Sequence, residues 1–389
     1  MAKEQAAETD GSAPKPAVPG LDGTFYMAYP IFSMCSDEHG LVLTGGGGGG
    51  KEYGVLDYIQ AHVYDETTES FTTVSSIETG TKVCYDLTYC PATDRFAAAL
   101  TSECLLLRFD PASLSLSCEA RFTAELSNPG QTVCNVLRYS PSGAELLTGG
   151  DDGVVRVWNL ASSTSTLRLA LDGHHKEIVD AEWAPSGDRF VTCGRDRSVK
   201  LWSGEGACTD TIIPEKVKAV SPLAKFARFV NDTCLIVATH GPRGPSWLTI
   251  YDVGSDGKTK EVRKSQISKA VICSMAVSQD RSQAVLGFVD STRMIISLAP
   301  TSMLFKNTAV VHEMPPGKAA FLLDKHVVCT SSADYSVNIW NIKKPARSHS
   351  LGCCWWLIFL LSLMALLYYC YLYAVEKGHL GGSGRLDEL

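Results

Sequence analysis

Apolar and polar positions alternate over short stretches between residues 21 and 344, and polar or glycine-containing turns separate these stretches. An alternation with a period of two is typical of β-strands that bury one face. A longer pattern also recurs: an apolar strand, a Ser-Pro-x-Gly or Asp-containing turn, a second strand, a tight turn, and a third strand that ends in an aromatic residue. Its clearest copies cover residues 137–160, 181–204 and 322–342. The pattern predicts an all-β domain built from repeats.

The repeats end at regular intervals along the chain. The seven end points are Trp158, Trp202 and Trp340 for the clear copies, and Tyr64, Phe109, Tyr251 and Ser297 for the weaker ones. Successive end points are about 43 to 49 residues apart, which fits one four-stranded blade per repeat. The copies resemble WD40 repeats, and this resemblance implies a seven-bladed β-propeller, in which each blade buries its faces against its neighbours.

One repeat carries polar residues that two kinds of site could explain. His174, Thr192, Asp196 and Trp202 occupy positions similar to the hydrogen-bond chain that holds a WD40 blade together. A histidine, a hydroxyl and an aspartate could also form a hydrolase relay, but their blade positions assign them to structure. The last repeat leaves no room for an outer strand before residue 345. We therefore expect residues 24–28 to supply that strand and close the ring.

A second kind of pattern lies near the C-terminus. Residues 353–373 read CCWWLIFLLSLMALLYYCYLY and contain no charged side chain. As a helix, these 21 residues would extend about 32 Å, enough to cross a hydrocarbon core of about 30 Å. Tryptophans at one end and tyrosines at the other are typical of membrane interfaces. The sequence predicts a single transmembrane helix, preceded by a linker at residues 345–352 and followed by a tail at residues 374–389.

The flanks of this segment predict its orientation and its membrane. Lys343, Lys344 and Arg347 precede it, and an excess of basic residues favours the cytosolic side. The final residues, Leu-Asp-Glu-Leu, resemble the retrieval signal that is read in the lumen of the endoplasmic reticulum. We expect a cytosolic propeller at residues 21–344 and a lumenal tail. Residues 1–20 are polar and rich in Pro and Ala, so they are expected to be a disordered tail without a signal peptide.

Composition excludes some functions and leaves others open. The net charge of −7 argues against a nucleic-acid surface, which would need a basic stripe. The fourteen cysteines include no pair with the CxxC spacing of a zinc site. Many of them lie singly in apolar strand patterns, so they are expected to be free thiols in a reducing compartment.

The most unusual segment is a run of six glycines, residues 45–50, which follows the expected strand at residues 41–44. Three interpretations compete. The run and Lys51 satisfy the GxxxxGK pattern of a phosphate-binding loop, but Glu52 replaces the Ser or Thr that holds Mg²⁺, and the loop joins two antiparallel strands. It could also be a flexible loop of low complexity without function. The third interpretation is a recognition loop whose bare backbone approaches a partner or surrounds a cation.

The glycine run, the propeller and the C-terminal anchor together resemble one family. It is the family of prolactin regulatory element-binding protein, the exchange factor of the endoplasmic reticulum for the Sar-type small GTPase that starts COPII coats. The resemblance implies a GTPase regulator without covalent chemistry or an organic cofactor, with coat components as further partners. It implies that a potassium ion is held by the backbone of Gly45, Gly46, Gly47 and Gly48. The residues that would reach between the switch regions of the GTPase are Gly49, Gly50, Lys51, Glu52, Tyr53 and Gly54.

One position departs from that family. Its members carry an Asn shortly after the loop that is important for exchange, whereas Asp57 stands there in this chain, and Gln60 is the only nearby amide. Asp57 therefore belongs to the expected exchange site, but with a different charge. An alternative function, a non-catalytic scaffold or cargo escort anchored in the same membrane, shares the fold, the anchor and the tail.

Overall fold

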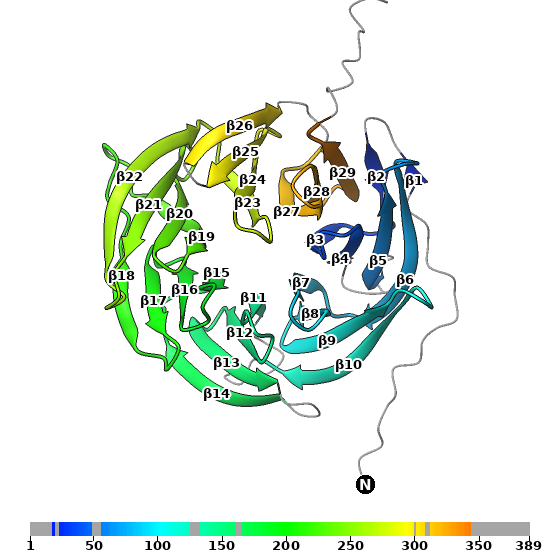
Figure 1. The fold of residues 1–389 in the computed structure, drawn as a ribbon, viewed down its shortest axis with the longest axis horizontal. Coiled ribbons are helices and arrows are strands. Elements are labelled where there is room, and N and C mark those ends of the chain that lie inside the picture. The colour runs from blue at the N-terminus through cyan, green and yellow to red at the C-terminus, as the bar shows by residue number, and fades with distance from the viewer. Residues whose placement is uncertain are drawn as a thin grey trace, which may run out of the picture. The chain divides into compact units, whose positions relative to one another are not determined.

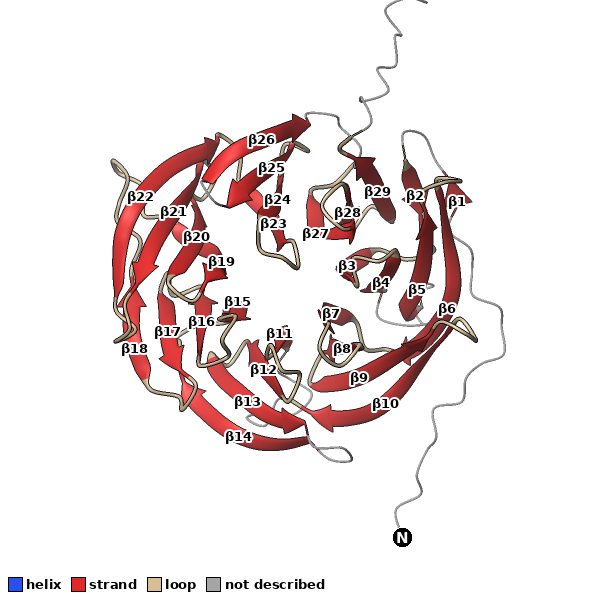
Figure 2. Cartoon of the chain, viewed as in Figure 1, coloured by secondary structure: helices blue, strands red, loops and turns tan. Residues whose placement is uncertain are grey.

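The computed structural model describes residues 18–19, 23–48, 56–124, 133–160, 165–298, 301–307 and 312–343. In these ranges the secondary structure consists of strands β1–β29, and no helix occurs (Figure 2). The strands pair into seven antiparallel sheets that stand radially around one axis (Figure 1). The chain divides into a compact unit that ends at Lys343 and a second unit that begins at Lys344. The prediction of an all-β, seven-bladed propeller is confirmed.

The first four blades follow the chain in order. Blade 1 contains β3 (Ile31–Ser36), β4 (Leu41–Gly46), β5 (Asp57–Asp65) and β6 (Ser70–Gly80). Blade 2 contains β7 (Cys84–Cys90), β8 (Arg95–Leu100), β9 (Glu103–Asp110) and β10 (Ser115–Thr123). Blade 3 contains β11 (Cys134–Tyr139), β12 (Glu145–Gly150), β13 (Val154–Leu160) and β14 (Ser165–Asp172). Blade 4 contains β15 (Ile178–Trp183), β16 (Arg189–Gly194), β17 (Val199–Ser203) and β18 (Cys208–Ile212).

The other three blades complete the ring. Blade 5 contains β19 (Leu223–Asn231), β20 (Cys234–His240), β21 (Ser246–Val253) and β22 (Thr259–Ser268). Blade 6 contains β23 (Ile272–Val277), β24 (Gln283–Phe288), β25 (Arg293–Leu298) and β26 (Thr301–Asn307). Blade 7 contains β27 (Pro316–Leu323), β28 (Val327–Ser332) and β29 (Ser336–Asn341), together with β2 (Thr24–Tyr26) and β1 (Val18–Pro19) from the N-terminal side.

The innermost strand of every blade carries a β-bulge near its first residue, where its pairing with the second strand shifts. A bulge inserts one residue into a strand, bends it and turns a side chain in a new direction. Most of the bulged residues line a central cavity: Tyr85, Asn135, Val179, Lys225, Cys273 and Gly317. The repeated bulges therefore decide which side chains reach the axis of the propeller.

The ring closes where the N-terminal strand β2 pairs with β29, the last strand of blade 7. Thr24 lies opposite Asn338 in this pairing, and Asn338 Nδ2 donates a hydrogen bond to Thr24 Oγ1 at 2.9 Å. The strand expected at residues 24–28 is thus confirmed, although it ends at Tyr26. A short strand, Val18–Pro19, pairs with β2 on its outer side, so these two residues belong to the sheet and not to the predicted tail.

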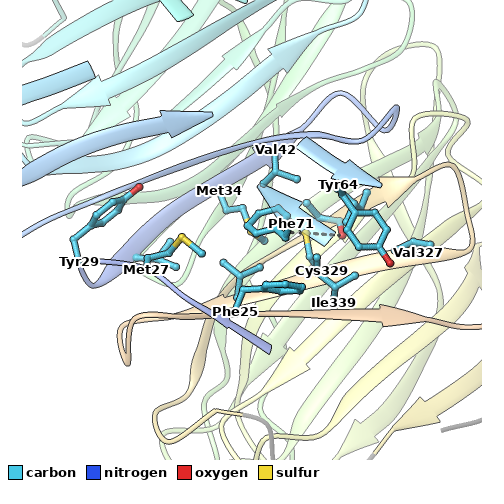
Figure 3. Packing of buried hydrophobic residues seen from close by; sticks show 14 residues of the cluster. Phe25, Met27, Tyr29, Met34, Val42, Tyr64, Phe71, Val327, Cys329 and Ile339 are labelled. Carbon is cyan, nitrogen blue, oxygen red and sulfur yellow. Dashed lines mark hydrogen bonds between the residues drawn. The ribbon is translucent and has the colours of Figure 1, made fainter. Parts of the chain in front are cut away.

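Buried apolar side chains fill the junction between blade 7 and blade 1. Phe25 of β2 lies against Phe71 of blade 1, with their ring centroids 5.4 Å apart. Figure 3 shows these rings beside Tyr64, Val327 and Ile339, which come from both blades. The closing strand therefore contributes to the core as well as to the sheet.

One prediction lies wholly outside the described residues, and another is partly covered by them. No helix among them is long and apolar enough to cross a membrane, and the predicted span and tail at residues 353–389 lie outside them. The eleven cysteines of the described ranges are all free. For these eleven, the expectation of free thiols is confirmed.

Candidate functional site

The glycine run begins inside a strand and not after it. Gly45 and Gly46 are the last two residues of β4, and they pair with β3 on one side and β5 on the other. The Gly45 carbonyl also accepts a hydrogen bond from Ser33 Oγ at 3.2 Å. The expected loop is therefore shorter than the run, because its first two glycines belong to the sheet.

Close packing explains why three of these positions are glycine. A Cβ atom on Gly46 would lie 1.9 Å from the carbonyl oxygen of Pro30. One on Gly47 would lie 1.8 Å from Asp57 Oδ1, and Gly47 also has a φ of +149°, which L side chains rarely adopt. On Gly45 a Cβ would meet Ser33 and Cys84 at 2.6–2.7 Å. Any larger residue would push the base of the loop apart.

The described part of the run ends at Gly48. Gly48 is exposed, whereas the predicted partner-contacting residues Gly49, Gly50, Lys51, Glu52, Tyr53 and Gly54 lie outside the described residues. Asp57, at the start of β5, is fully buried, with its carboxylate against Gly47. Gln60 is 2% exposed within β5. Of the residues predicted for the site, the structure thus brings together Gly47 and Asp57, while Gln60 faces the interior of the blade.

A buried hydrogen-bond chain holds the strands on both sides of this loop. Thr44 Oγ1, on β4, is 2.7 Å from Tyr29 Oη and 2.8 Å from His62 Nε2 on β5. His62 Nδ1 is 3.0 Å from Thr73 Oγ1 on β6, so three neighbouring strands are linked. The base of the glycine-rich segment is therefore fixed by side chains as well as by the sheet.

The same positions in blade 4 show the usual form of this chain. His174 lies 2.8 Å from Thr192 Oγ1 through Nε2 and 3.1 Å from Asp196 Oδ2 through Nδ1. Trp202 Nε1 donates to Thr192 Oγ1 at 3.0 Å. The structural assignment of these four residues is confirmed, because their hydrogen bonds stay within one blade and end on a tryptophan.

The sequence separation between equivalent residues of the second and third strands shows how much longer the loop of blade 1 is. Thr44 and His62 are 18 residues apart, whereas Thr192 and Trp202 are 10 apart, as are Thr148 and Trp158 in blade 3. Blade 1 therefore carries an insertion of eight residues between its second and third strands. Sequence reasoning missed that His62 stands at the tryptophan position and Tyr29 near the histidine position. The constant spacing in the clear repeats was the signal that could have found them.

The burial of His62 makes the blade sensitive to acid. Burial lowers the pKa of His62 to about 3, against about 6.5 in an unfolded chain. Between these pH values His62 is protonated in the unfolded chain and stays neutral in the folded blade, so stability falls as the pH drops below 6.5. At pH 5 we expect His62 to cost about 2 kcal/mol of unfolding free energy relative to pH 7.5. Urea unfolding at both pH values measures this difference.

A His62→Gln variant separates His62 from the other titrating groups. The amide can still form hydrogen bonds but takes up no proton, so the variant should lose about 2 kcal/mol less than the wild type between pH 7.5 and pH 5. Equal losses in the two proteins would assign the acid sensitivity to other groups, such as His312, whose pKa burial lowers to about 4.

The central cavity, of about 500 Å³, is the other candidate site. Blades 2, 3, 4, 5 and 7 contribute charged side chains to its wall. Asp86 accepts hydrogen bonds from Lys318 Nζ at 2.6 Å and from Arg138 Nη1 at 2.5 Å. Arg138 also lies 3.3 Å from Asp180, which pairs with Arg228. This alternating chain of charges joins β27, β7, β11, β15 and β19 around the axis.

These ion pairs keep the buried carboxylates charged. Burial alone would raise the pKa of Asp86, but Arg138 and Lys318 outweigh it and lower the pKa to about 2. Likewise, burial opposes the charge on Arg228, while Asp180 and Glu182 raise its pKa. The described residues contain no group of three His, Cys, Asp or Glu side chains placed to hold a metal ion. Sequence reasoning missed this network, since its residues come from five different repeats.

Comparison with known proteins identifies the repeats. Residues 120–159 and 165–203 match the model of the WD domain, G-beta repeat. The ribosome biogenesis protein YTM1 of Coccidioides immitis is 25% identical over 227 residues, which are 56% of this chain and 44% of that protein. The chromatin assembly factor 1 subunit FAS2 homolog of Oryza sativa subsp. japonica is 34% identical over 87 residues, 21% of this chain and 17% of that protein.

A third relative, nuclear distribution protein PAC1-2 of Uncinocarpus reesii, is 26% identical over 155 residues, 34% of this chain and 31% of that protein. The matches thus span less than half the length of each of these three relatives. The matched repeats and the seven sheets lead to the same conclusion: the chain carries WD40 repeats and folds as a seven-bladed WD40 β-propeller.

Proposed function

We propose that this propeller is a nucleotide exchange factor for the Sar-type small GTPase, anchored in the membrane of the endoplasmic reticulum by residues 353–373. The observation that carries the proposal is the eight-residue insertion in blade 1, with its glycine-rich sequence and its rigid base. A loop that is longer than its counterparts and emerges from a fixed frame is suited to reach into a partner. The uncharged segment and the Leu-Asp-Glu-Leu tail support a location in the membrane of the endoplasmic reticulum. We propose that exchange at this membrane starts COPII coats.

The proposed mechanism needs binding energy and no covalent step. The factor binds the nucleotide-free GTPase more tightly than the nucleotide-bound form, and by linkage this preference drives nucleotide release. Residues 49–54 would act as the wedge between the switch regions. The hydrogen bonds among Tyr29, Thr44 and His62 hold the strands from which the wedge emerges, so less ordering entropy is lost on binding.

The residues at the base of the loop fit a potassium ion. Gly45 and Gly46 already pair with both neighbouring strands, so we assign the cation to the backbone carbonyls of Gly47 and Gly48, beside the Asp57 carboxylate. The Asp57 carboxylate packs directly against Gly47, where a Cβ would lie 1.8 Å from Oδ1, and oxygen atoms are the ligands that hard cations prefer. A bound ion would supply positive charge that draws these oxygens together.

The test is fluorescence-monitored release of labelled GDP from a purified Sar-type GTPase by the full chain in detergent. We expect release to accelerate at least about tenfold, equivalent to about 1.4 kcal/mol of barrier, and more in potassium than in sodium buffer. Replacing residues 48–55 with a two-residue Asn-Gly turn should abolish the acceleration. The matched control replaces the short turn Thr101-Ser102 of blade 2 with Asn-Gly and should keep it. A loop-replaced protein that still exchanges at the wild-type rate would refute the wedge.

The second candidate is a membrane-anchored scaffold without exchange activity, and Asp57 favours it. A carboxylate stands where the exchange-factor family has an amide, and Asp57 is fully buried, with its carboxylate beside Gly47. The Asp57→Asn variant distinguishes the two functions. If Asp57 only weakens an exchange factor, the variant should be faster than the wild type, whereas a scaffold stays inactive with either residue.

A further inference from the structure

The cationic side chains of the propeller gather on one sector of one rim. We define the upper rim as the edge of the propeller that carries two kinds of segment: the turns between the second and third strands, and the connections between blades. The glycine-rich segment of blade 1 lies on this rim. On blades 4 and 5, the connection before blade 4 and the connections that follow both blades, the described upper rim carries Lys176, Arg195, Arg197, Lys216, Lys218, Lys225, Arg243 and Lys269. It carries three carboxylates there, Glu177, Asp196 and Glu215. This set of eight cationic residues is called the basic sector.

The charges of the basic sector are largely uncompensated. Arg195 pairs with Glu177, and the other seven cations form no ion pair with any described residue. Asp196, one of the three carboxylates, is hydrogen-bonded to Ser198 and His174 within its own blade, and the eight cations exceed the three carboxylates by five. The whole chain has a net charge of −7, so the basic sector reverses the overall sign locally. Unpaired like charges that crowd together repel one another and attract an anionic partner.

Lys225 extends the basic sector into the central cavity. It is the bulged residue of β19, and its side chain lines the cavity together with Arg195 and Lys318. Burial, Lys318 and Arg195 lower the pKa of Lys225 and outweigh Asp180, which raises it, so the nearby carboxylate does not compensate for the burial of this cation. Lys225 therefore brings to the cavity wall an ammonium group that forms no ion pair with a described residue. An incoming carboxylate would neutralise it.

We propose that the basic sector docks an acidic, extended polypeptide segment, one of whose Asp or Glu side chains enters the cavity mouth and pairs with Lys225. Three features favour a polypeptide over other anions. The cavity volume of about 500 Å³ admits single side chains and no duplex or bilayer. The cations come from five separate turns and connections of the rim and from β19, so a segment with several carboxylates can engage more of them than a single phosphate group. Ile213, three residues before Lys216 in the same connection, is 70% exposed and offers apolar contact to a side chain of the same segment.

The test uses a fluorescein-labelled ten-residue peptide of alternating Asp and Glu, bound to the full chain in detergent and followed by fluorescence anisotropy. We expect binding at 50 mM salt that weakens at 200 mM. Reversing four charges in Lys216→Glu, Lys218→Glu, Arg243→Glu and Lys269→Glu should weaken it at least about tenfold. The Lys225→Met variant should weaken it as well, while its circular dichroism spectrum stays that of the wild type.

A matched control puts the same kind of change elsewhere. Lys260 and Arg263 are exposed on β22 and form no ion pair with a described residue. The Lys260→Glu/Arg263→Glu variant should bind the peptide within about twofold of the wild type. A loss of binding free energy per reversed charge as large as that of the basic-sector variant would show that only net charge matters and would overturn the proposal.

Competing anions test the chemical class of the occupant. Inositol hexakisphosphate, single-stranded oligonucleotide and vesicles with phosphatidylserine are added at matched charge concentration to the peptide complex. The proposal expects the peptide to bind more tightly than each of them. Tighter binding of any of these three, with the same dependence on Lys225, would assign the site to a phosphate compound, a nucleic acid or a membrane and would refute the polypeptide. Nucleotide exchange on the GTPase does not enter this test, so the two proposals can fail separately.

Discussion

Removal of residues 1–28 is expected to prevent the propeller from closing and to leave a protein that aggregates or unfolds below 37 °C. The deletion takes away β1 and β2, the outer strands of blade 7, and exposes the backbone edge of β29. It also removes Phe25 and Met27, which are 6% and 7% exposed. Burial of two such side chains is worth about 5 kcal/mol, a large part of the total stability of a domain. Thermal unfolding followed by circular dichroism measures the loss.

A pair of point variants on the same strand tests the packing part of this expectation. Phe25→Ala should cost about 3–5 kcal/mol because the ring lies in the core against Phe71. Tyr26, its neighbour, is 44% exposed, so Tyr26→Ala should cost less than about 1 kcal/mol. Similar losses in the two variants would mean that β2 contributes through its backbone alone.

The second large effect is expected for Asp180→Ala, with a loss of about 3–5 kcal/mol of unfolding free energy. Asp180 is 1% exposed and accepts hydrogen bonds from the Arg228 side chain and, at 3.0 Å, from the Ala227 backbone. Without it, Arg228 keeps a buried charge that has lost its closest carboxylate. Breaking one side of a buried pair is more costly than removing both. Urea unfolding gives the value.

Two further variants complete this test. The double variant Asp180→Leu/Arg228→Leu removes both charges and should recover at least about half of the loss. Asp188→Ala removes a carboxylate whose side chain is 53% exposed, and it should change stability by less than about 0.5 kcal/mol. If the double variant is less stable than Asp180→Ala, the ion pair is a net source of stability and the desolvation argument is wrong.

The number of blades and the way the ring closes could be predicted from the sequence because both depend on local patterns. Alternation of apolar residues marks strands, and the regular spacing of Trp158, Trp202 and Trp340 fixes the repeat. The closing strand followed from a count: the last repeat lacked a fourth strand, and residues 24–28 had strand composition. These inferences need no knowledge of how distant residues meet.

The charged network and the exact start of the glycine loop could not be predicted in this way. A bulge shifts the pairing of each inner strand, and it decides whether Asp86, Asp180 or Lys318 faces the axis. Such a one-residue shift leaves no mark in the apolar pattern. Similarly, Gly45 and Gly46 look like loop residues, but the close approach of Pro30 and Cys84 makes them strand residues without side chains.

The pairing of β2 with β29 has a consequence for the order of events during synthesis. Thr24 and Asn338 are 314 residues apart, so the first strand leaves the ribosome long before its partner exists. At about 5–20 residues per second, the wait is roughly 15 to 60 s. Throughout this time the N-terminal strand and the edge of blade 1 have no neighbour, while blades 2 to 6 can already stack in sequence. We therefore expect the nascent chain to pass through an unclosed arc of blades, in which blade 1 is the part most accessible to chaperones.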